Sequence, residues 1–228
     1  KIITFGEIMG RLASPDFLRL RQCHSFDVTY AGAEASVAVS IANFAGDVIY
    51  VSALPKHAIA DAALDSLRSF GVNTEHVIRS DVGRLGLYFL ETGANQRPSR
   101  VIYDREYSTI SLTSPSAYNW DEIFKDAGWI HLSGITPALS SLAAESTLIA
   151  AKQAKSKNIK VSLDLNFRKN LWKWSENKTS QELAKETMSK ILPYVDVLIA
   201  NEEDCSDVLD IKADNTDVSK GAIDAAKY

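Results

Sequence analysis

The sequence contains little cysteine and no long apolar stretch. Cys23 and Cys205 are the only cysteines among its 228 residues, and they stand far apart in the chain. Because isolated thiols are typical of proteins in reducing compartments, we expect no disulfide bond and a cytoplasmic location. No apolar run approaches the ~18 residues of a membrane-spanning helix, so we expect neither a membrane segment nor a secretory signal.

Several motifs that mark common functions are also absent. The four histidines show no metal-ligand spacing; they are His24, His57, His76 and His131. The chain has neither the GxGxxG loop of dinucleotide-binding proteins nor a Walker-type glycine–lysine loop. The formal net charge is −4 and the basic residues form no cluster, which argues against a nucleic-acid partner or a membrane surface.

What the sequence does contain is an ordinary globular composition, with 46% hydrophobic and 24% charged residues. Strand-like apolar runs alternate with helical patterns. The predicted strands in this alternation are 1–5, 48–54, 129–132, 161–165 and 196–200. The predicted helices are one that opens in YAGAEAS and ends at Gly46 as a C-cap, then 59–70 (ended by Gly71), 137–157, 181–192 and one starting at 201–204. From residue 212 onward the composition is polar and helical.

This alternation predicts one α/β domain over 1–228, with a mainly parallel central sheet and helices on both faces. Two strand-like runs, 85–91 and 100–105, have a turn-rich connector and no helix between them, which indicates a β-hairpin. Alternation in 24–30 suits an exposed strand. Segments 11–30 and 84–108 are therefore expected to form a small β-sheet lid over the ligand edge of the sheet. A (β/α) barrel fits the alternation but fits this hairpin poorly.

Polar clusters follow three of the predicted strands. They are 133–134 (Ser-Gly), 164–168 (DLNFR) and 201–204 (NEED). Each cluster alone is as consistent with helix capping as with a site. Because parallel strands present their carboxyl ends to one side of a sheet, three clusters favour a ligand site. Arg168 suits an anionic ligand such as a carboxylate or phosphate, and the alternative is an ion pair with Asp164 or another acid.

Other candidates come from the hairpin and from the helix that opens in YAGAEAS. Tyr103 and Arg105 share one face of their strand, and Tyr88 lies in the partner strand. This set either closes over a polar, anionic small molecule or forms a solvated face. Gly32, at the entry to the helix, permits close approach of the backbone to a ligand or serves as a turn. The carboxylates of 201–204 either stabilise a helix N-terminus or clamp a hydrated Mg²⁺.

Six strings of the sequence together resemble the ribokinase-like (PfkB) carbohydrate kinases, most closely the 2-keto-3-deoxygluconate kinases. The strings are GEIMGRL, YAGAEASVAVSIANFAG, RLGLYFLETGANQRPSRVIYDREYS, WIHLSGITPAL, SLDLNFRKNLW and VDVLIANEED. The resemblance covers nearly the whole chain. It implies a three-layer ribokinase-like fold and phosphorylation of a sugar or sugar-acid hydroxyl with ATP and Mg²⁺. It also implies a homodimer formed through the β-lid.

The resemblance further implies roles for individual residues. Substrate binding is implied for Gly32, Ala33, Tyr88, Tyr103, Arg105 and Arg168. Arg168 is also implied to stabilise charge during catalysis. Asn166 and Asn201 are implied to bind the cofactor, and Asn201 and Asp204 to hold Mg²⁺ through water. Asp164 is expected to orient Arg168 or its loop and not to act as the base.

The sequence departs from the family pattern at several positions. The glycine pair of the family is Ala31–Gly32 here, its following asparagine is Ser36, a later glycine is Ala60, and a glutamate is Asp204. The anion-hole loop of the family, with its aspartate base, lies beyond Tyr228. The chain as given is therefore expected to lack the C-terminal part of the fold and to be inactive alone. The departures at Ala31 and Ser36 leave open a non-catalytic relative that binds a sugar acid as a sensor or scaffold.

Overall fold

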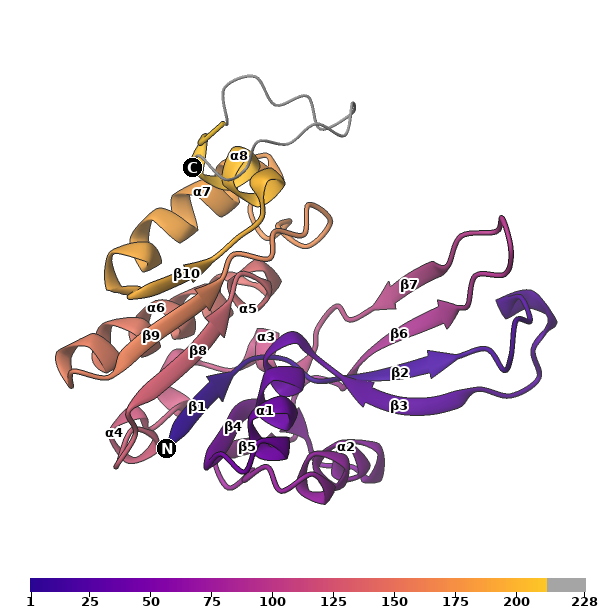
Figure 1. Cartoon of the computed structure of the whole chain (residues 1–228), viewed down its shortest axis with the longest axis horizontal. Helices are drawn as coiled ribbons and strands as arrows, with labels where there is room; N and C mark the ends of the chain where they lie inside the picture. Colours follow the sequence, from indigo (N-terminus) through magenta and orange to yellow (C-terminus); the bar gives the residue numbers. More distant parts are fainter. Residues whose placement is uncertain (213–228) are drawn as a thin grey trace.

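Six parallel strands form the central sheet of the protein, for which a computed structural model describes residues 1–212 (Figure 1). Their order across the sheet is β10 (Val197–Ile199), β9 (Lys160–Asp164), β8 (Trp129–Ser133), β1 (Ile2–Phe5), β4 (Val48–Pro55) and β5 (Val77–Ser80). Every pairing between neighbours is parallel. The predicted parallel α/β sheet is confirmed, and β5 is the strand that the sequence pattern missed.

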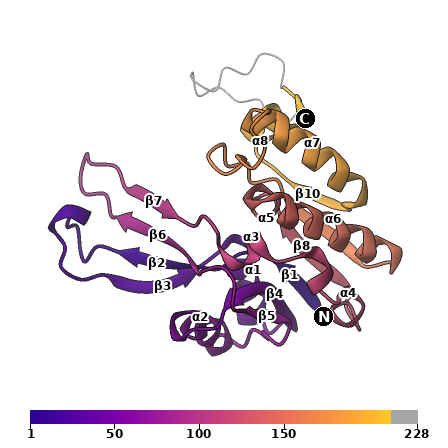
Figure 2. The same ribbon diagram turned by 180° about the vertical axis from the view of Figure 1, so that it is seen from behind.

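Helices cover both faces of this sheet. The longer helices are α1 (Ala33–Asn43), α2 (Ala58–Ser69), α6 (Ser141–Ser156), α7 (Ser180–Ile191) and α8 (Glu202–Leu209). The short ones are α3 (Thr109–Leu112), α4 (Trp120–Ile123), α5 (Ile135–Leu139) and the 3₁₀ turns η1 (Leu20–Gln22), η2 (Pro115–Ala117) and η3 (Leu192–Tyr194). α1 and α2 pack on one face, and α6 and α7 pack on the other, which is the side that Figure 2 shows.

Strand β4 shows why the central runs are continuously apolar. Val48 and Tyr50 are buried in the hydrophobic cluster that contains α1 and α2. Ile49, Val51 and Ala53 are buried in the larger cluster that contains α6 and α7. A strand covered on both faces needs apolar side chains at successive positions, so it carries no hydrophobic–polar alternation. The apolar run in the sequence therefore correctly predicted a doubly covered strand.

A separate mixed sheet projects from one end of the central sheet (Figure 1). Its strand order is β3 (Asp27–Ala31), β2 (Met9–Ala13), β6 (Gly86–Glu91) and β7 (Arg100–Asp104). β6 and β7 form the predicted antiparallel hairpin, with Tyr88 opposite Tyr103. β2, which the sequence pattern missed, joins the two halves by pairing antiparallel with β3 and parallel with β6.

Two helix predictions were wrong in detail. The predicted helix 137–157 is interrupted at Ser140, whose backbone is extended, and this separates α5 from α6. The Ser140 hydroxyl accepts the Ala143 N–H at 3.0 Å, so it caps α6 locally. At the end of α1 the left-handed residue is Ala45, with φ of 59°, and not Gly46. The Gly46 N–H instead donates to the Ile41 carbonyl at 2.9 Å.

No helix within residues 1–212 is both long enough and apolar enough to cross a bilayer. Cys23 and Cys205 are free thiols. The tail after residue 212, whose composition is polar and helical, lies outside the described residues.

Candidate active site

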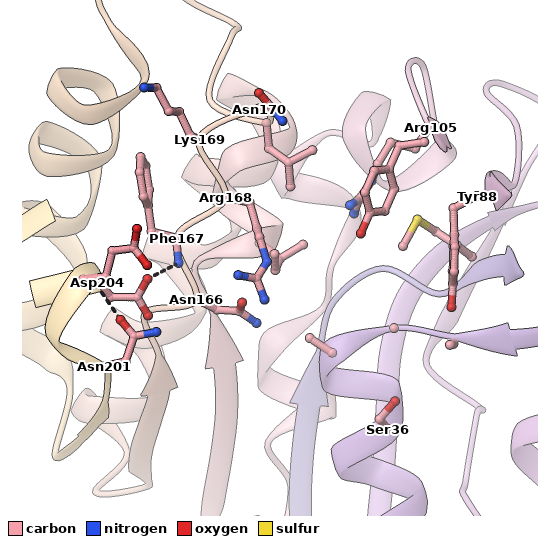
Figure 3. A pocket seen from close by; sticks show the side chains of 18 residues that line it. Ser36, Tyr88, Arg105, Asn166, Phe167, Arg168, Lys169, Asn170, Asn201 and Asp204 are labelled. Atoms are coloured by element: carbon pink, nitrogen blue, oxygen red, sulfur yellow. Dashed lines mark hydrogen bonds between the residues drawn. The ribbon is translucent and has the colours of Figure 1, made fainter. Parts of the chain in front are cut away.

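A cavity of about 550 Å³ opens between the small sheet and the carboxyl ends of the central strands (Figure 3). Its walls come from all four strands of the small sheet or their ends, from the first turns of α1 and α8, and from the loop after β9. The predicted site residues all line it: Gly32, Ala33, Tyr88, Tyr103, Arg105, Asn166, Arg168, Asn201 and Asp204. The structure thus brings the whole predicted set together, while the roles of its members stay predictions.

The loop after β9 carries Arg168 into one wall of the cavity. Asn166 lies in the left-handed region, with φ of 38°, a conformation that asparagine tolerates better than most residues. The Phe167 N–H donates to Asp204 Oδ1 at 3.1 Å, which ties the loop to α8. Within residues 1–212 other arginines form ion pairs but Arg168 forms none, so the ion pair that was the alternative to an anionic ligand is not observed.

Asp164 contributes to the loop in a different way. Burial, and then the nearby carboxylate of Asp204, raises the pKa of Asp164 above its usual range. The backbone of Asn166 and then the charge of nearby Arg168 oppose this rise. Asp164 thus lies near both the loop backbone and Arg168 without an ion pair between Asp164 and Arg168, and its role in orienting the loop stays a prediction.

Asn201 and Asp204 act first as structural groups at the start of α8. Asn201 Oδ1 accepts the Asp204 N–H at 2.7 Å, which caps the helix, and Asp204 Oδ1 is engaged by Phe167. The part of the chain that the structure describes contains no group of three His, Cys, Asp or Glu side chains able to hold a metal ion. Within residues 1–212 these residues therefore form no all-protein metal cage, and their contact with Mg²⁺ through water stays a prediction.

The opposite wall is formed by side chains of the small sheet. Tyr88 and Tyr103 are opposite one another across β6 and β7, with ring centroids 5.8 Å apart. The guanidinium carbon of Arg105 lies 5.7 Å from the centroid of the Tyr103 ring. Burial raises the pKa of the partly buried Tyr88 hydroxyl, and nearby Arg11 opposes this rise. Figure 3 shows Tyr88 and Arg105 facing Arg168 and Asn166 across the cavity.

Arg105 has a partner that the sequence pattern did not indicate. Its side chain is buried, and it forms a hydrogen-bonded ion pair with the buried carboxylate of Glu7. Glu7 lies between β1 and β2, so this pair joins the central sheet to β7 of the small sheet. Arg105 is therefore not a free cation at the cavity wall, because Glu7 compensates its charge.

Gly32 is required by packing and not by an unusual backbone angle. Its φ of −169° is extended and available to any residue. A Cβ at this position, however, would lie 2.0 Å from the backbone oxygen of Glu7. Glycine thus lets the start of α1 pass against the β1–β2 connection, next to the cavity. Ser36, one of the departures from the family pattern, also lines the cavity from α1.

A second buried acid, Glu34, was missed by the sequence reasoning. Glu34 lies in the first turn of α1 and is fully buried. Its Oε1 accepts the hydroxyls of Ser133 at 2.6 Å and Thr136 at 3.0 Å. Ser133, from the polar cluster after β8, therefore binds Glu34 and caps α5 through the Ile135 N–H, and it does not line the cavity. The contacts of Ser133 are therefore those that the capping interpretation of this cluster predicts.

The loop side of the cavity has a donor set that fits phosphate oxygens. Arg168 brings positive charge and the amides of Asn166 and Asn170 also line this side, whereas the Lys169 side chain extends away from the Arg168 guanidinium (Figure 3). Guanidinium and amide donors are typical ligands of phosphate. A nucleotide phosphate is therefore compatible with the residues present.

The profile of the pfkB family carbohydrate kinases matches residues 1–227. The chain belongs to this family. The resemblance stated from the sequence is thereby confirmed, and the central sheet with its separate mixed sheet is the fold of the family's ribokinase-like members.

Individual members of the pfkB family are similar to this chain over most of its length. The 2-dehydro-3-deoxygalactonokinase of Haloferax volcanii is 34% identical over 214 residues, which are 94% of this chain and 64% of that protein. The crystal structure of 2-dehydro-3-deoxygluconokinase from Thermotoga maritima matches with a TM-score of 0.88 and 46% identity, over 94% of this chain and 63% of that one. Fructokinase from Xylella fastidiosa with bound ATP matches with a TM-score of 0.73 and 26% identity, over 87% and 60%. The chain thus spans less than two thirds of the length of these relatives.

Proposed function

We propose that the whole protein transfers a phosphoryl group from ATP to a hydroxyl of a 2-keto-3-deoxy sugar acid. The names of the relatives from Haloferax volcanii and Thermotoga maritima support this substrate class. The observation that carries the proposal is the cavity itself. An arginine without an acidic partner among residues 1–212, Arg168, lines the same cavity as Tyr88, Tyr103 and Arg105. This combination suits a ligand that has hydroxyls along its length and a carboxylate at one end.

Different residues of the cavity bind the acceptor, stabilise negative charge and contact the phosphates. ATP would supply the phosphoryl group, and catalysis then depends on positioning and on charge stabilisation. Gly32, Ala33 and the two tyrosines hold the acceptor, with Arg105 donating from its fixed position beside Glu7. Arg168 stabilises the negative charge of the acid or of the transferring group. Asn166 and Asn201 donate to phosphate oxygens from the loop side.

The general base is proposed to come from outside the described residues. Among residues 1–212 the acids that line the cavity are Glu203 and Asp204. Asp204 is 7% exposed and already accepts the Phe167 N–H, so it is poorly placed to take a proton from a hydroxyl. That residues 1–228 alone bind a sugar acid without phosphorylating it is a proposal that rests on the family resemblance, and turnover of the acid with ATP by this fragment would overturn it.

A kinase assay of the full-length protein tests this proposal. The panel contains 2-keto-3-deoxygluconate, 2-keto-3-deoxygalactonate and neutral hexoses, each with ATP, and binding is measured in parallel by calorimetry. Turnover of a keto-deoxy acid at least tenfold more efficient than turnover of any hexose is the expected result. Turnover of hexoses alone would overturn the substrate class. Tight binding of the acid without turnover by the full-length protein would instead favour the non-catalytic sensor suggested by Ala31 and Ser36.

We also propose a cytoplasmic location and a homodimer that forms through the small sheet. The two free thiols, Cys23 and Cys205, suit a reducing compartment. For the dimer, an apolar row crosses all four strands of the small sheet in register: Val28, Leu12, Phe89 and Ile102. Because neighbouring residues of a strand point to opposite faces, this row lies on the face opposite the tyrosines of the cavity. Exposed apolar rows of this kind favour protein contacts.

Replacing Ile102 with lysine is expected to weaken this dimer at least about tenfold, because an unpaired charge would enter an apolar interface. Val101→Lys is the matched control. Val101 is 42% exposed and Ile102 is 40% exposed, but the two side chains lie on opposite faces of β7. Sedimentation equilibrium of the full-length protein gives the dissociation constants. Equal dissociation constants for the two variants would show that the row is not the dimer contact.

A further inference from the structure

The buried carboxyl of Glu34 lies among the end of β8, the first turn of α5 and Gly6, which follows β1. Its Oε1 accepts hydrogen bonds from the hydroxyls of Ser133 and Thr136, while Oε2 has no hydrogen-bond partner among residues 1–212. Oε2 lies against Gly6, where a Cβ would be only 2.1 Å away. Glycine at position 6 therefore makes room for this carboxyl. An ionised carboxylate with one oxygen buried and unpaired is costly, whereas a neutral acid at the same place is much less so.

The charges around Glu34 also favour the neutral acid. Arg105 is the cation that acts on it, but the guanidinium is already paired with Glu7. Burial raises the pKa of Glu34, and Ser133, the backbone of Glu34 itself, Thr136 and Arg105 oppose the rise without cancelling it. The other ionisable groups on the packed elements are Tyr50 on β4, His131 on β8, and Asp164, which is in register with Ser133. Burial lowers the pKa of His131, so it adds no positive charge at neutral pH.

We propose that Glu34 is a positioning residue, held as the neutral acid, that fixes the wall of the ligand cavity. Glu34 follows Gly32 and Ala33, which line the cavity, and its carboxyl binds the end of β8 and the first turn of α5. It thereby anchors the first turn of α1 to the central sheet, beside the Glu7–Arg105 pair that anchors the small sheet. The effect of Glu34 on acceptor binding rests on the proposed function, but its protonation does not.

The test uses Glu34→Gln, Glu34→Ala and Thr136→Val in the full-length protein, with 2-keto-3-deoxygluconate as the calorimetric probe. Glutamine imitates the neutral acid, so its acceptor Kd should stay within about twofold of wild type. The alanine variant should bind at least tenfold more weakly. If it does not fold, Thr136→Val, which keeps the side-chain size and removes one donor, should bind at least threefold more weakly.

The unfolding temperature, measured as a function of pH, distinguishes a Glu34 held as the neutral acid from a Glu34 with a purely structural role. A folded-state pKa above the usual value of 4.5 means that wild type loses stability as pH rises from 4.5 towards the folded pKa. Glutamine does not titrate, so the Tm of Glu34→Gln minus that of wild type should increase over this window by about 2 °C or more. At neutral pH the wild type should also show a protonated-carboxyl stretch in the infrared that Glu34→Gln lacks.

Three results would overturn the proposal: a glutamine variant as weak as the alanine variant, alanine and valine variants that bind like wild type, or an infrared signature of ionised Glu34. If wild type binds no sugar acid, the proposed function fails. Hydrogen exchange in the first turn of α1 then replaces the affinity measurement. It should be faster in Glu34→Ala and Thr136→Val but unchanged in Glu34→Gln, and equal rates in all of them would overturn the positioning role.

Discussion

In the full-length protein, Arg168→Ala is expected to lower kcat/KM for phosphorylation of a keto-deoxy acid by about 10²–10³-fold, or about 3–4 kcal/mol. Arg168 lines the cavity and has no acidic partner among residues 1–212, so its charge is available to the ligand. Its backbone is fixed by the hydrogen bond from Phe167 to Asp204 and by the left-handed turn at Asn166. Little reorganisation is therefore needed before its charge acts on the acid or the transferring group.

Steady-state kinetics with Arg168→Lys and Lys169→Ala alongside check this prediction. Lysine keeps the charge but loses the planar fork, so it should recover only part of the activity. Lys169 is the matched control, since it is the next cation in the chain and its side chain extends away from Arg105 and Tyr88 (Figure 3). Lys169→Ala should stay within about threefold of wild type. Activity of Arg168→Ala within threefold of wild type would show that another group stabilises the negative charge of the acid or of the transferring group.

The parallel sheet and the edge at which the site forms were predictable from the sequence, because both follow from local patterns. Apolar runs such as 48–54 are continuous when both faces of a strand are covered, and β4 is covered in this way. The polar residues after β9 and β10 reach one cavity because parallel strands end on the same side. The hairpin was predictable for the same reason, since its turn-rich connector leaves no room for a helix.

The features that the sequence did not predict depend on contacts between distant segments. β2 has no clear strand pattern of its own, but it pairs on both sides with β3 and β6. The Glu7–Arg105 pair joins residues 98 positions apart, and Glu34 reaches Ser133 across 99 positions. Nothing in the neighbourhood of a glutamate in the sequence indicates that it will be buried. The break between α5 and α6 depends on Ser140, whose capping geometry competes with a helical pattern that continues on both sides.

Replacing Gly32 with alanine is expected to lower the free energy of unfolding by about 3 kcal/mol or more. The new Cβ would stand 2.0 Å from the oxygen of Glu7, 3.0 Å from its carbonyl carbon and 3.2 Å from the Ile8 Cα. These are backbone atoms, so no side-chain rotation relieves the clash. The β1–β2 connection and the start of α1 must move apart, and Glu7 moves with them. Because Glu7 holds Arg105, acceptor affinity should fall together with stability.

Urea unfolding followed by circular dichroism measures the change in stability, with Gly128→Ala as the matched control. Gly128 is exposed, and a Cβ added there would meet no heavy atom within 4 Å, so its alanine variant should stay within about 0.5 kcal/mol of wild type. The two variants add the same methyl group, and they differ only in what that group meets. A Gly32→Ala protein as stable as Gly128→Ala would mean that the two segments separate at little cost. Gly32 would then matter through its approach to the ligand and not through its packing against Glu7.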